Sequence, residues 1–407
     1  MKILVVSQYF WPEDFRINDI VSSLVDRGHD VEVLTGKPNY PEGFIFLGYR
    51  VWGCQQERWK GATVHRVPLV GRGSKSAVKL GVNYLCFILS GLLFAPWQLK
   101  GRTYDVIFVY APSPILQAIP ALLLGWLKKS PVIIWVQDLW PESIAATGYV
   151  RSTTLLNAVK SVVRFIYRHA DLLLVQSQAF IPHIAALMPR QQVIYYPNSV
   201  DSIFCNPPRG TLPEIPALNG IFPVVFTGNV GVGQAVEVIV EAATLLRGYP
   251  EICFVIFGNG SRWDWMRNEV ELRGLTNLHL LGRFPIETMP GYMQKASALL
   301  ITLADNPIFS STVPNKLQAY MAAGRPILAC LNGEGARLVK DAGAGLTIAA
   351  EDAGGLAKAI ISLSKMPRTD REVLGENGRK YFRKNFDQDQ LTDKLISHFQ
   401  DMLKKVD

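Results

Sequence analysis

The sequence predicts an α/β protein made of two doubly wound domains in series, each with a parallel sheet covered by helices on both faces. The chain has 407 residues, which is more than one ordinary hydrophobic core needs. Short apolar runs alternate with longer helical stretches in both halves, and this alternation is typical of buried parallel strands joined by helices. A proline-rich segment interrupts the alternation once, so the two halves are predicted to be separate domains.

The N-terminal half begins with a strand and continues in strand–helix order. Strands are expected at residues 3–6, 30–35, 106–110, 132–136 and 172–176, and helices at 18–27, 115–127 and 155–169. The pattern stops at 197–220, where prolines and glycines occur without periodicity, as in a linker.

The C-terminal half repeats the alternation. Strands are expected at residues 224–226, 253–257, 278–280, 299–302, 327–329 and 345–348. The predicted division is an N-terminal domain (1–198), a linker (199–222), a C-terminal domain (223–370) and C-terminal helices (371–407) that pack back on the N-terminal domain. Ligands of such sheets bind outside the carboxyl ends of the strands, so we expect the domains to face each other across a cleft.

Charge and cysteine content limit the possible partners. The net charge of +8 and the pI of about 9.1 suit phosphate-rich partners, but no basic run resembles a nucleic-acid-binding arm. The five cysteines are scattered and form no metal-ligand pair, which indicates a reducing cytoplasm. The first residues enter a strand directly, without the features of a signal peptide.

An uncharged stretch, residues 80–99, has the length of a membrane-spanning helix. Its polar and helix-breaking residues, Asn83, Ser90, Pro96 and Gln98, argue against a span. Three interpretations remain open: a helix that dips into one membrane face, a core helix, and a true span.

Glycine-rich turns follow two strands of the C-terminal half. FTGNVGVGQAVEVIVEAA (226–243) contains Gly228, Gly231 and Gly233, in an order opposite to that of a dinucleotide fingerprint. Gly258 and Gly260 form a second turn, and Arg283 follows the next strand. A phosphate group held by backbone amides on a helix N-terminus is the functional interpretation, and a tight turn without ligand is the alternative.

A third candidate is the helix that begins near Pro314. Proline suits the first helical position, which places Lys316 in the first turn, where a cation opposes the helix dipole. A bound diphosphate would compensate this charge; a solvated lysine is the alternative.

In the N-terminal half, VQDLWPES (136–143) follows a buried strand. Asp138 and Glu142, beside Trp140, could bind a sugar hydroxyl or accept its proton, although Asp138 could instead cap the following turn. Two further loops follow strands nearby and could meet a substrate; they contain Glu13, Arg16, Asn18 and Tyr40. The loop with Tyr40 could equally be an ordinary surface loop. No nucleophile signature and no metal-ligand constellation appears.

Taken in order, these motifs resemble the GT-B glycosyltransferases, and within them the large retaining family GT4. The resemblance covers essentially the whole chain, from MKILVVSQYFWPEDFRIND through VQDLWPES, PNSVDSIF, FTGNVGVGQAVEVIVEAA and LGRFP to VPNKLQAYMAAGRPILACLNGEGARLV. QYFWPEDFRIND and TGKPNYPEG add a finer likeness to bacterial transferases that resemble the O-antigen N-acetyl-L-fucosamine transferases.

The resemblance implies that the C-terminal domain binds a nucleotide-sugar, expected to be UDP-linked, and that the N-terminal domain binds the acceptor. Sugar transfer would retain the anomeric configuration and need neither metal nor cofactor, because basic side chains and amides stabilise the leaving diphosphate. The implied catalytic residues are Asp138, Lys316 and Glu334. The implied donor-binding residues are Gly228, Asn229, Gly231, Gly233, Gln234, Gly258, Gly260, Arg283, Asn315 and Gln318, and those on the acceptor side are Glu13, Arg16, Asn18, Tyr40, Trp140 and Glu142.

The sequence departs from the family pattern in three places. Two family glutamates are replaced by Ser310 and Gln318, a basic pair by Asn229 and Gln234, and an acceptor-side histidine by Gln137. Glu334 would then replace one missing carboxylate by reaching the donor sugar.

Acceptors of this class are usually built on polyprenyl diphosphate in the membrane, so the uncharged helix is expected to contact the membrane. We expect a cytoplasmic protein bound peripherally, and in a salt-sensitive way, to the inner face of the cytoplasmic membrane. Basic residues expected to meet anionic lipid are Lys75, Lys79, Lys100, Arg102, Lys128 and Lys129. The alternatives are a nucleotide-sugar epimerase of the same fold and a non-catalytic sugar- or lipid-binding assembly protein.

Overall fold

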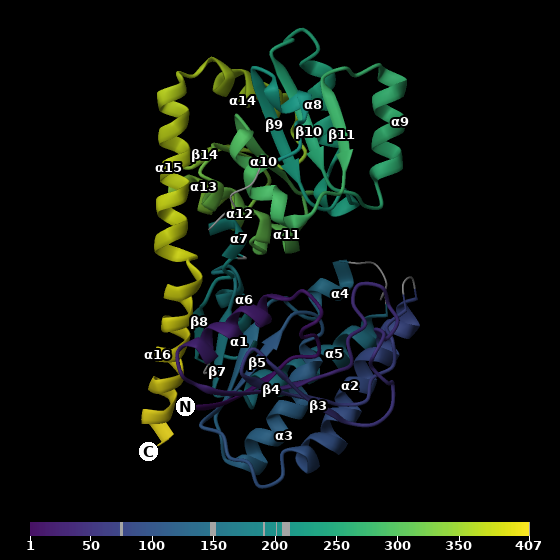
Figure 1. Cartoon of the computed structure of the whole chain (residues 1–407), viewed down its shortest axis with the longest axis vertical. Helices are drawn as coiled ribbons and strands as arrows, with labels where there is room; N and C mark the ends of the chain where they lie inside the picture. Colours follow the sequence, from purple (N-terminus) through teal and green to yellow (C-terminus); the bar gives the residue numbers. More distant parts are fainter. Residues whose placement is uncertain (74–75, 147–151, 190–191, 201, 206–211, 407) are drawn as a thin grey trace. The chain divides into compact units, whose positions relative to one another are not determined.

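The computed structural model describes residues 1–73, 76–146, 152–189, 192–200, 202–205 and 212–406. The chain forms two compact units (Figure 1). Unit 1 contains Met1–Pro197 and Gln388–Asp407, and unit 2 contains Asn198–Asp387.

Unit 1 contains an eight-stranded sheet in the order β3-β4-β2-β1-β5-β6-β7-β8. Its strands are β1 (Lys2–Val6), β2 (Asp30–Thr35), β3 (Gln55–Trp59), β4 (Ala62–Arg66), β5 (Val106–Ala111), β6 (Val132–Val136), β7 (Leu172–Val175) and β8 (Val193–Tyr195). All neighbours are parallel except β3 and β4, and the predicted strands are confirmed to within a residue. The sequence analysis missed β3, β4 and β8, because β3 is polar and β8 is only three residues long.

Helices cover both faces of this sheet. They are α1 (Arg16–Asp26), α2 (Ala77–Gln98), η1 (Ile115–Ala118), α3 (Ile119–Lys128), α4 (Glu142–Ala146), α5 (Thr153–Arg168), α6 (Phe180–Leu187) and α16 (Gln388–Val406). The hydrophobic core lies on both sides of the strands and includes Leu391, Leu395 and Phe399 from α16. The Tyr196 hydroxyl donates to Leu391 O at 3.0 Å, which ties the end of the chain to unit 1.

Helix α2 contains the uncharged stretch and is long and apolar enough to cross a membrane. One side of it is buried in unit 1, including Asn83, Phe87 and Ala95. Asn83, one of the polar residues that argue against a span, serves this packing: the Gln8 amide nitrogen donates to Asn83 Oδ1 at 2.7 Å, and Asn83 Nδ2 donates to Val70 O at 2.6 Å. The opposite side of α2 is exposed.

Unit 2 contains a six-stranded parallel sheet in the order β11-β10-β9-β12-β13-β14. Its strands are β9 (Phe222–Thr227), β10 (Ile252–Phe257), β11 (Leu278–Gly282), β12 (Ala298–Thr302), β13 (Ile327–Cys330) and β14 (Gly345–Ile348), each at its predicted place. Its helices are α7 (Ser202–Cys205), η2 (Pro216–Asn219), η3 (Val232–Gln234), α8 (Glu237–Leu245), α9 (Trp263–Arg273), η4 (Ile286–Thr288), α10 (Met289–Lys295), α11 (Pro307–Ser311), α12 (Asn315–Ala323), α13 (Glu334–Ala342), α14 (Ala353–Lys365) and α15 (Arg368–Asn385).

Two segments differ from the sequence expectation in their packing. The described parts of the expected linker belong to unit 2, where α7 packs against α10 and α12. The expected C-terminal pair of helices is divided: α15 packs on α12 within unit 2, whereas α16 packs on α1 within unit 1. A glycine–glycine contact explains the place of α15, because a Cβ at Gly375 would lie 2.2 Å from Gly324 O.

Candidate functional site

In unit 2 the turn after β9 exposes backbone amides. The Gly228 amide donates to Phe257 O, and the Val230 amide donates to Asn259 O. Within the described part of the chain, the amides of Asn229, Gly231, Val232 and Gly233 have no hydrogen-bond partner. Gly228 and Asn229 are exposed, so the turn presents donors to solvent. Such a cluster of backbone donors suits an anion.

The turn is not the N-terminus of a long helix, which corrects the sequence expectation. It leads into the short η3, and α8 begins only at Glu237. Glu237 accepts from Arg262 Nε at 2.8 Å, so a carboxylate already occupies the first turn of α8. Any anion at Gly228–Gly233 would therefore be held by the turn itself.

The second glycine turn, at Gly258 and Gly260, packs against the first. A Cβ at Gly258 would lie 1.7 Å from Gly228 O, a distance that no side chain tolerates. Gly260 also packs against Val230 and Asn229, and the Asn259 side chain accepts from the Gly260 amide at 2.6 Å. These glycines allow two neighbouring strand ends to approach closely; they shape the turn after β9.

Lys316 lies beside this turn. Its Nζ donates to Gln234 Oε1 at 2.8 Å and lies 4.0 Å from the centroid of the Phe226 ring. The Nζ is also 3.5 Å from the point where a Cβ at Gly228 would lie. Burial lowers the pKa of Lys316 to about 7, and no carboxylate contacts it among the described residues. The structure thus brings together Gly228, Gln234 and Lys316, and leaves the ammonium without a counter-charge.

Pro314 is the N-cap residue of α12, one position before the predicted one, and Lys316 is in the first turn as expected. Gly324 ends α12 in the left-handed conformation, with φ 67°.

Glu334 begins α13 at the next strand end. It is 7% exposed and pairs with Arg337, whose Nε donates to Glu334 Oε2 at 3.0 Å. The preceding Gly333 has φ 73°, and a Cβ there would lie 2.0 Å from Ser310 O. Glu334 is therefore next to Ser310, one of the two positions where the family pattern has a glutamate.

The remaining donor-side residues differ in exposure. Arg283 follows β11 and is exposed, and Asn315 accepts from Asn198 Nδ2 at 3.1 Å. Gln318 is 1% exposed; its amide nitrogen faces Asn315 O at 2.9 Å and Pro314 O at 3.0 Å. The expected contact of Gln318 with a ribose hydroxyl is not supported, because its side chain points into unit 2 and holds the start of α12.

In unit 1, Asp138 follows β6 and is mostly buried, and burial raises its pKa. Its carboxylate has no hydrogen-bond partner in the described residues, so it does not cap the following turn. Burial raises the pKa of both Tyr84 and Tyr110; the Asp138 charge adds to this, while Arg72 opposes it at Tyr84 and Arg16 opposes it at Tyr110. Asp138 thus lies within electrostatic range of both tyrosines. Tyr84 and Arg72 were not predicted.

Glu13 is buried and holds two loops together. Its Oε1 accepts from the amides of Asn39 and Tyr40 at 2.7 Å each, and its Oε2 accepts from the Phe10 amide at 3.2 Å. Burial raises its pKa to about 7 despite these bonds. The expected direct contact of Glu13 with an acceptor is therefore replaced by a loop-holding role, because its side chain is 2% exposed.

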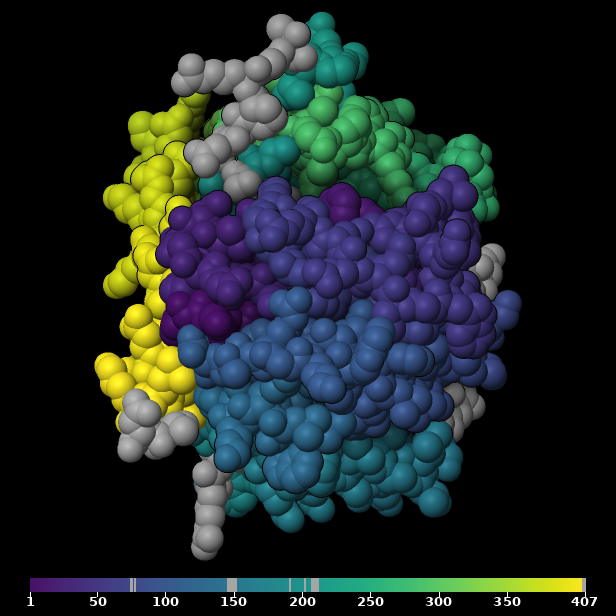
Figure 2. Space-filling model, turned by 60° about the horizontal axis from the view of Figure 1, so that its bottom comes forward, coloured from purple at the N-terminus to yellow at the C-terminus, as the bar shows by residue number. Residues whose placement is uncertain are grey.

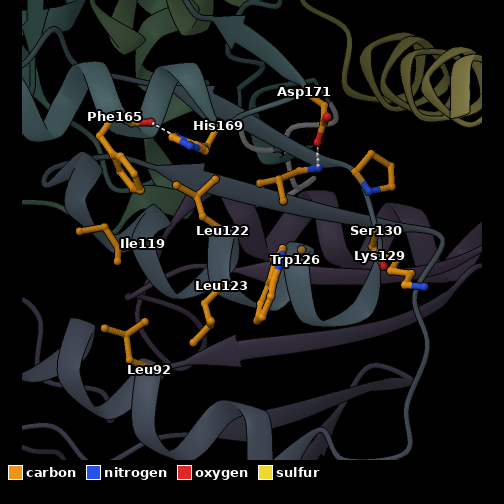
Figure 3. Close-up of a pocket in the computed structure, with 13 residues that line it drawn as sticks. Leu92, Ile119, Leu122, Leu123, Trp126, Lys129, Ser130, Phe165, His169 and Asp171 are labelled. Atoms are coloured by element: carbon orange, nitrogen blue, oxygen red, sulfur yellow. Dashed lines mark hydrogen bonds between the residues drawn. The ribbon is translucent and has the colours of Figure 1, made fainter.

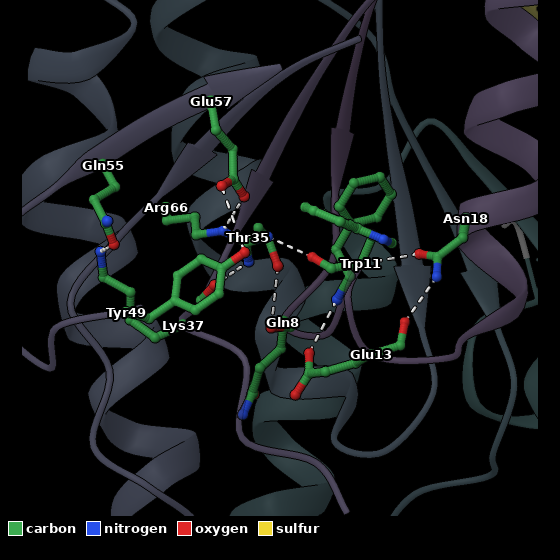
Figure 4. A network of polar contacts seen from close by, with 12 residues as sticks. Gln8, Trp11, Glu13, Asn18, Thr35, Lys37, Tyr49, Gln55, Glu57 and Arg66 are labelled. Carbon is green, nitrogen blue, oxygen red and sulfur yellow. Dashed lines mark hydrogen bonds and ion pairs between the residues drawn. The ribbon is translucent and has the colours of Figure 1, made fainter. Parts of the chain in front are cut away.

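Asn18 has a similar local role in Figure 4. Its Oδ1 accepts from the Trp11 amide at 3.0 Å, and its Nδ2 donates to Glu13 O at 2.7 Å. Arg66 lies behind the same loop, fully buried, and donates to Gly36 O at 2.9 Å and to Glu57 Oε1 at 2.6 Å. Sequence reasoning missed Arg66, because a basic residue at a strand end gives no signal that it will be buried.

Tyr40 contributes to an exposed aromatic surface at this edge. The Arg72 guanidinium lies 4.9 Å from the Tyr40 ring centroid, and the Phe15 ring lies 5.0 Å from it. Arg16 is paired with Asp19 at 3.7 Å. Tyr40 and Arg72 together offer a planar, cationic surface of the kind that binds sugars and phosphates.

Trp140 and Glu142 lie apart from this surface, in a pocket of about 310 Å³ between α5 and α6 that Tyr167 and His183 also line. The Trp140 indole donates to Ser113 Oγ at 3.0 Å. No group of histidine, cysteine and acidic side chains able to hold a metal ion occurs among the described residues.

The fold and these strand-end sites define the class: this is a GT-B glycosyltransferase. Residues 15–199 match the family described as "Glycosyl transferase 4-like domain", and residues 222–366 match "Glycosyl transferases group 1". Together the two matches cover most of both units, and the chain belongs to the group 1 glycosyltransferases.

Among relatives, the chain is 24% identical over 352 residues to WcaI of Escherichia coli (strain K12), the proposed colanic acid biosynthesis glycosyl transferase; 80% of this chain and 82% of WcaI are covered. Sucrose-phosphate synthase from Thermosynechococcus elongatus shares the fold, with a TM-score of 0.75, 16% identity and 99% coverage of each chain. Anabaena HepE, solved in complex with UDP and glucose, has a TM-score of 0.69 and 14% identity, with 98% of this chain and 100% of HepE covered.

Proposed function

We propose that this protein transfers a sugar from a UDP-linked nucleotide-sugar to a saccharide carried on polyprenyl diphosphate, during the synthesis of a bacterial surface polysaccharide. The observation that carries the proposal is the pairing of unsatisfied amides at Asn229, Gly231, Val232 and Gly233 with the uncompensated Lys316 ammonium. The amides lack acceptors and the ammonium, bonded only to the neutral Gln234 amide oxygen, lacks a counter-charge, whereas a diphosphate supplies several negatively charged oxygens.

The chemistry of this site follows from charge. When the bond between the anomeric carbon and the diphosphate oxygen breaks, the electron pair stays on the diphosphate. Lys316 and the turn amides would stabilise that developing charge, without a metal or a separate cofactor. Arg283, Asn229, Gln234 and Asn315 would lie around the nucleotide, and Glu334 would contact the donor sugar. The reaction would proceed with retention of configuration.

Asp138 is proposed to bind the attacking hydroxyl of the acceptor. Its carboxylate has no internal partner in the described residues, is half-buried, and lies within electrostatic range of Tyr84 and Tyr110. A raised pKa suits a group that receives a proton during the reaction. Arg16, Tyr40 and Arg72 would bind the saccharide or the lipid diphosphate nearby.

Two observations support the choice of substrates. Solved relatives hold UDP and glucose, or UDP-2-fluoro glucose in the trehalose-6-phosphate protein of E. coli, and WcaI is placed in colanic acid biosynthesis. The exposed side of α2 suits a protein that works at a membrane, so we propose a peripheral position on the cytoplasmic face. N-acetyl-L-fucosamine, or a related deoxyamino sugar of O-antigen or capsule, is the proposed sugar; the resemblance of QYFWPEDFRIND and TGKPNYPEG supports it.

The test is a transfer assay with radiolabelled UDP-sugars and polyprenyl-diphosphate saccharides extracted from bacterial membranes. We expect label in the lipid fraction, and less of it by ~10²-fold or more with the Lys316→Ala variant. Lys365→Ala, an exposed lysine of α14, is the matched control and should transfer normally.

Other outcomes would contradict the proposal. An isomerised free nucleotide-sugar would indicate an epimerase, and binding without turnover for every donor and acceptor would indicate a non-catalytic assembly protein. A requirement for a divalent cation would refute the metal-independent stabilisation of the leaving group.

A further inference from the structure

An apolar pocket of about 580 Å³ opens between α2, α3 and α5 of unit 1 (Figure 3). The side chains of Leu92, Ile119, Leu122, Leu123 and Phe165 line it, with Trp126 beside them. This volume is in the range of small-molecule sites. Pro131 and Val132, which also line it, precede or begin β6. The pocket is therefore at the amino ends of the strands, whereas Asp138 follows the carboxyl end of β6.

The surface around the pocket is also apolar. Helix α2 exposes one continuous stripe at intervals of three and four residues: Val78 (76%), Val82 (50%), Leu85 (58%), Leu89 (58%), Leu93 (70%) and Trp97 (70%). Helix α3 packs beside α2 and adds Trp126, 77% exposed, and α5 adds Phe165, 52% exposed. In Figure 2 the indigo and blue part of the chain that contains α2 and α3 lies open on one face of unit 1. An exposed apolar surface of this extent marks a site of interaction.

Two exposed lysines lie at the edge of the pocket. Lys129 lines the pocket, is exposed, and has no ion-pair or hydrogen-bond partner among the described residues; Lys100 is exposed nearby at the end of α2. Two of the basic residues expected to meet lipid are occupied instead. Lys128 Nζ donates to Leu99 O at 2.6 Å and to Arg102 O at 2.9 Å, and Arg102 pairs with Glu32. Lys75 lies outside the described residues.

The acidic and imidazole groups in the pocket wall, Asp171 and His169, are exposed, and each is bonded to a backbone group nearby. Asp171 Oδ2 accepts from the Val132 amide at 2.7 Å, and His169 Nδ1 donates to Phe165 O at 2.8 Å (Figure 3). The pocket thus combines an apolar interior with a free cation at its edge. An acyl chain that ends in a phosphate has the complementary character.

We infer that this pocket takes one acyl chain of an anionic glycerophospholipid from the bilayer, with the lipid phosphate at Lys129, while the exposed stripe of α2 and Trp126 rest in the membrane interface. The inference rests on the proposed membrane location and adds its lipid and its binding residues. The polyprenyl chain of the acceptor would have to run roughly 16 Å along β6 to join this pocket to the edge of the sheet that holds Asp138. A second copy of the chain is disfavoured by the charge of Lys129 and Lys100, which would repel the same residues across a two-fold interface.

The first experiment uses phosphatidylglycerol with a photoreactive diazirine at the middle of one acyl chain, mixed into phosphatidylcholine vesicles. After illumination, cross-linked peptides of the full-length protein are mapped by mass spectrometry. We expect adducts on peptides containing Leu122, Leu123 and Phe165. Adducts confined to the α2 stripe, or an equal yield from a phosphatidylcholine probe, would overturn the acyl-chain site.

Variants then test the two parts of the site separately. Leu123→Trp fills the pocket and should reduce the adduct yield at least tenfold; Leu272→Trp on the exposed side of α9 is the matched control and should not change it. Lys129→Gln should weaken binding to vesicles of equal phosphatidylglycerol and phosphatidylcholine about fivefold, against no change for Lys365→Gln. Phe165→Ala enlarges the pocket and provides a second variant if Leu123→Trp lowers the melting temperature.

Failure of the lipid site and failure of the proposed transfer reaction can be distinguished. Transfer to a short-chain acceptor in detergent should be normal in Leu123→Trp, because the pocket is remote from Asp138. Lipid adducts in a protein without transferase activity would refute the proposed function and leave the lipid site standing. Normal transfer without adducts, or a dimer that buries Trp126 and does not bind vesicles, would overturn the lipid site alone.

Discussion

The carboxyl edges of the two sheets are built in different ways. In unit 1 the strands end in long loops that buried charged side chains hold in place: Glu13 accepts from three backbone amides, and Arg66 donates to Gly36 O. In unit 2 the strands end in glycine turns, and the amides of Asn229, Gly231, Val232 and Gly233 are left without partners in the described chain. The backbone amides at the unit 1 edge donate to side chains of the protein itself, whereas several amides at the unit 2 edge remain available to a ligand. We therefore expect unit 1 to select its substrate through side chains, and unit 2 to select its substrate through backbone amides.

The largest effect should come from Lys316, the cation beside the unit 2 turn. We expect Lys316→Ala to lower kcat by ~10²-fold or more, because it removes the charge that faces the leaving diphosphate. Steady-state transfer rates with a UDP-sugar donor measure this. Lys365→Ala is the control, and a near-normal kcat for Lys316→Ala would show that the lysine serves only packing.

A comparable loss is expected on the other sheet. Asp138→Asn should reduce transfer by ~10²-fold, because the carboxylate is proposed to receive or orient the proton of the attacking hydroxyl. The affinity for UDP, measured by calorimetry, should be unchanged. If UDP binding were lost in Asp138→Asn, the assignment of donor and acceptor to the two units would be reversed.

Glu13 tests whether the unit 1 loops depend on a buried carboxyl. Burial raises its pKa from 4.5 to about 7 in the folded protein. The folded state therefore holds a proton that the unfolded state releases, so stability from this group is present below pH 4.5 and is lost as the pH rises through 7. In urea unfolding, the free energy of wild type relative to Glu13→Gln should fall by about 2 kcal/mol between pH 5 and 8. A constant difference would mean that Glu13 does not titrate in this range.

A graded effect is expected in the pH dependence of donor binding. The ligand-free pKa of Lys316 is about 7, lowered by burial from 10.5. Only the protonated lysine attracts a diphosphate, so UDP-N-acetylglucosamine should bind more weakly as the pH rises above 7, by up to about tenfold per pH unit. Lys316→Arg stays charged and should show a flat profile between pH 6 and 9. An equally steep profile in Lys316→Arg would place the titrating group elsewhere.

The sequence determined the architecture, because parallel strands buried on both faces appear as continuous apolar runs. Local patterns of this kind predict both sheets. They also predict that Lys316 lies in the first turn of α12 and that this helix ends at Gly324. The sequence analysis missed β3, whose polar residues lie at the sheet edge. It also treated residues 371–407 as one unit, although α15 belongs to unit 2 and α16 to unit 1.

Only the tertiary structure decided which polar side chains are available for chemistry. Glu13 and Gln318 have residue types suited to ligand binding, yet their oxygens and nitrogens are used on backbone groups inside the protein. Arg72 and Tyr84 gave no signal in the sequence, yet they lie near Asp138 or the aromatic surface at its edge. The physical reason is that periodicity reports the environment of a residue along its own strand or helix, whereas the partners of a polar group come from segments distant in sequence.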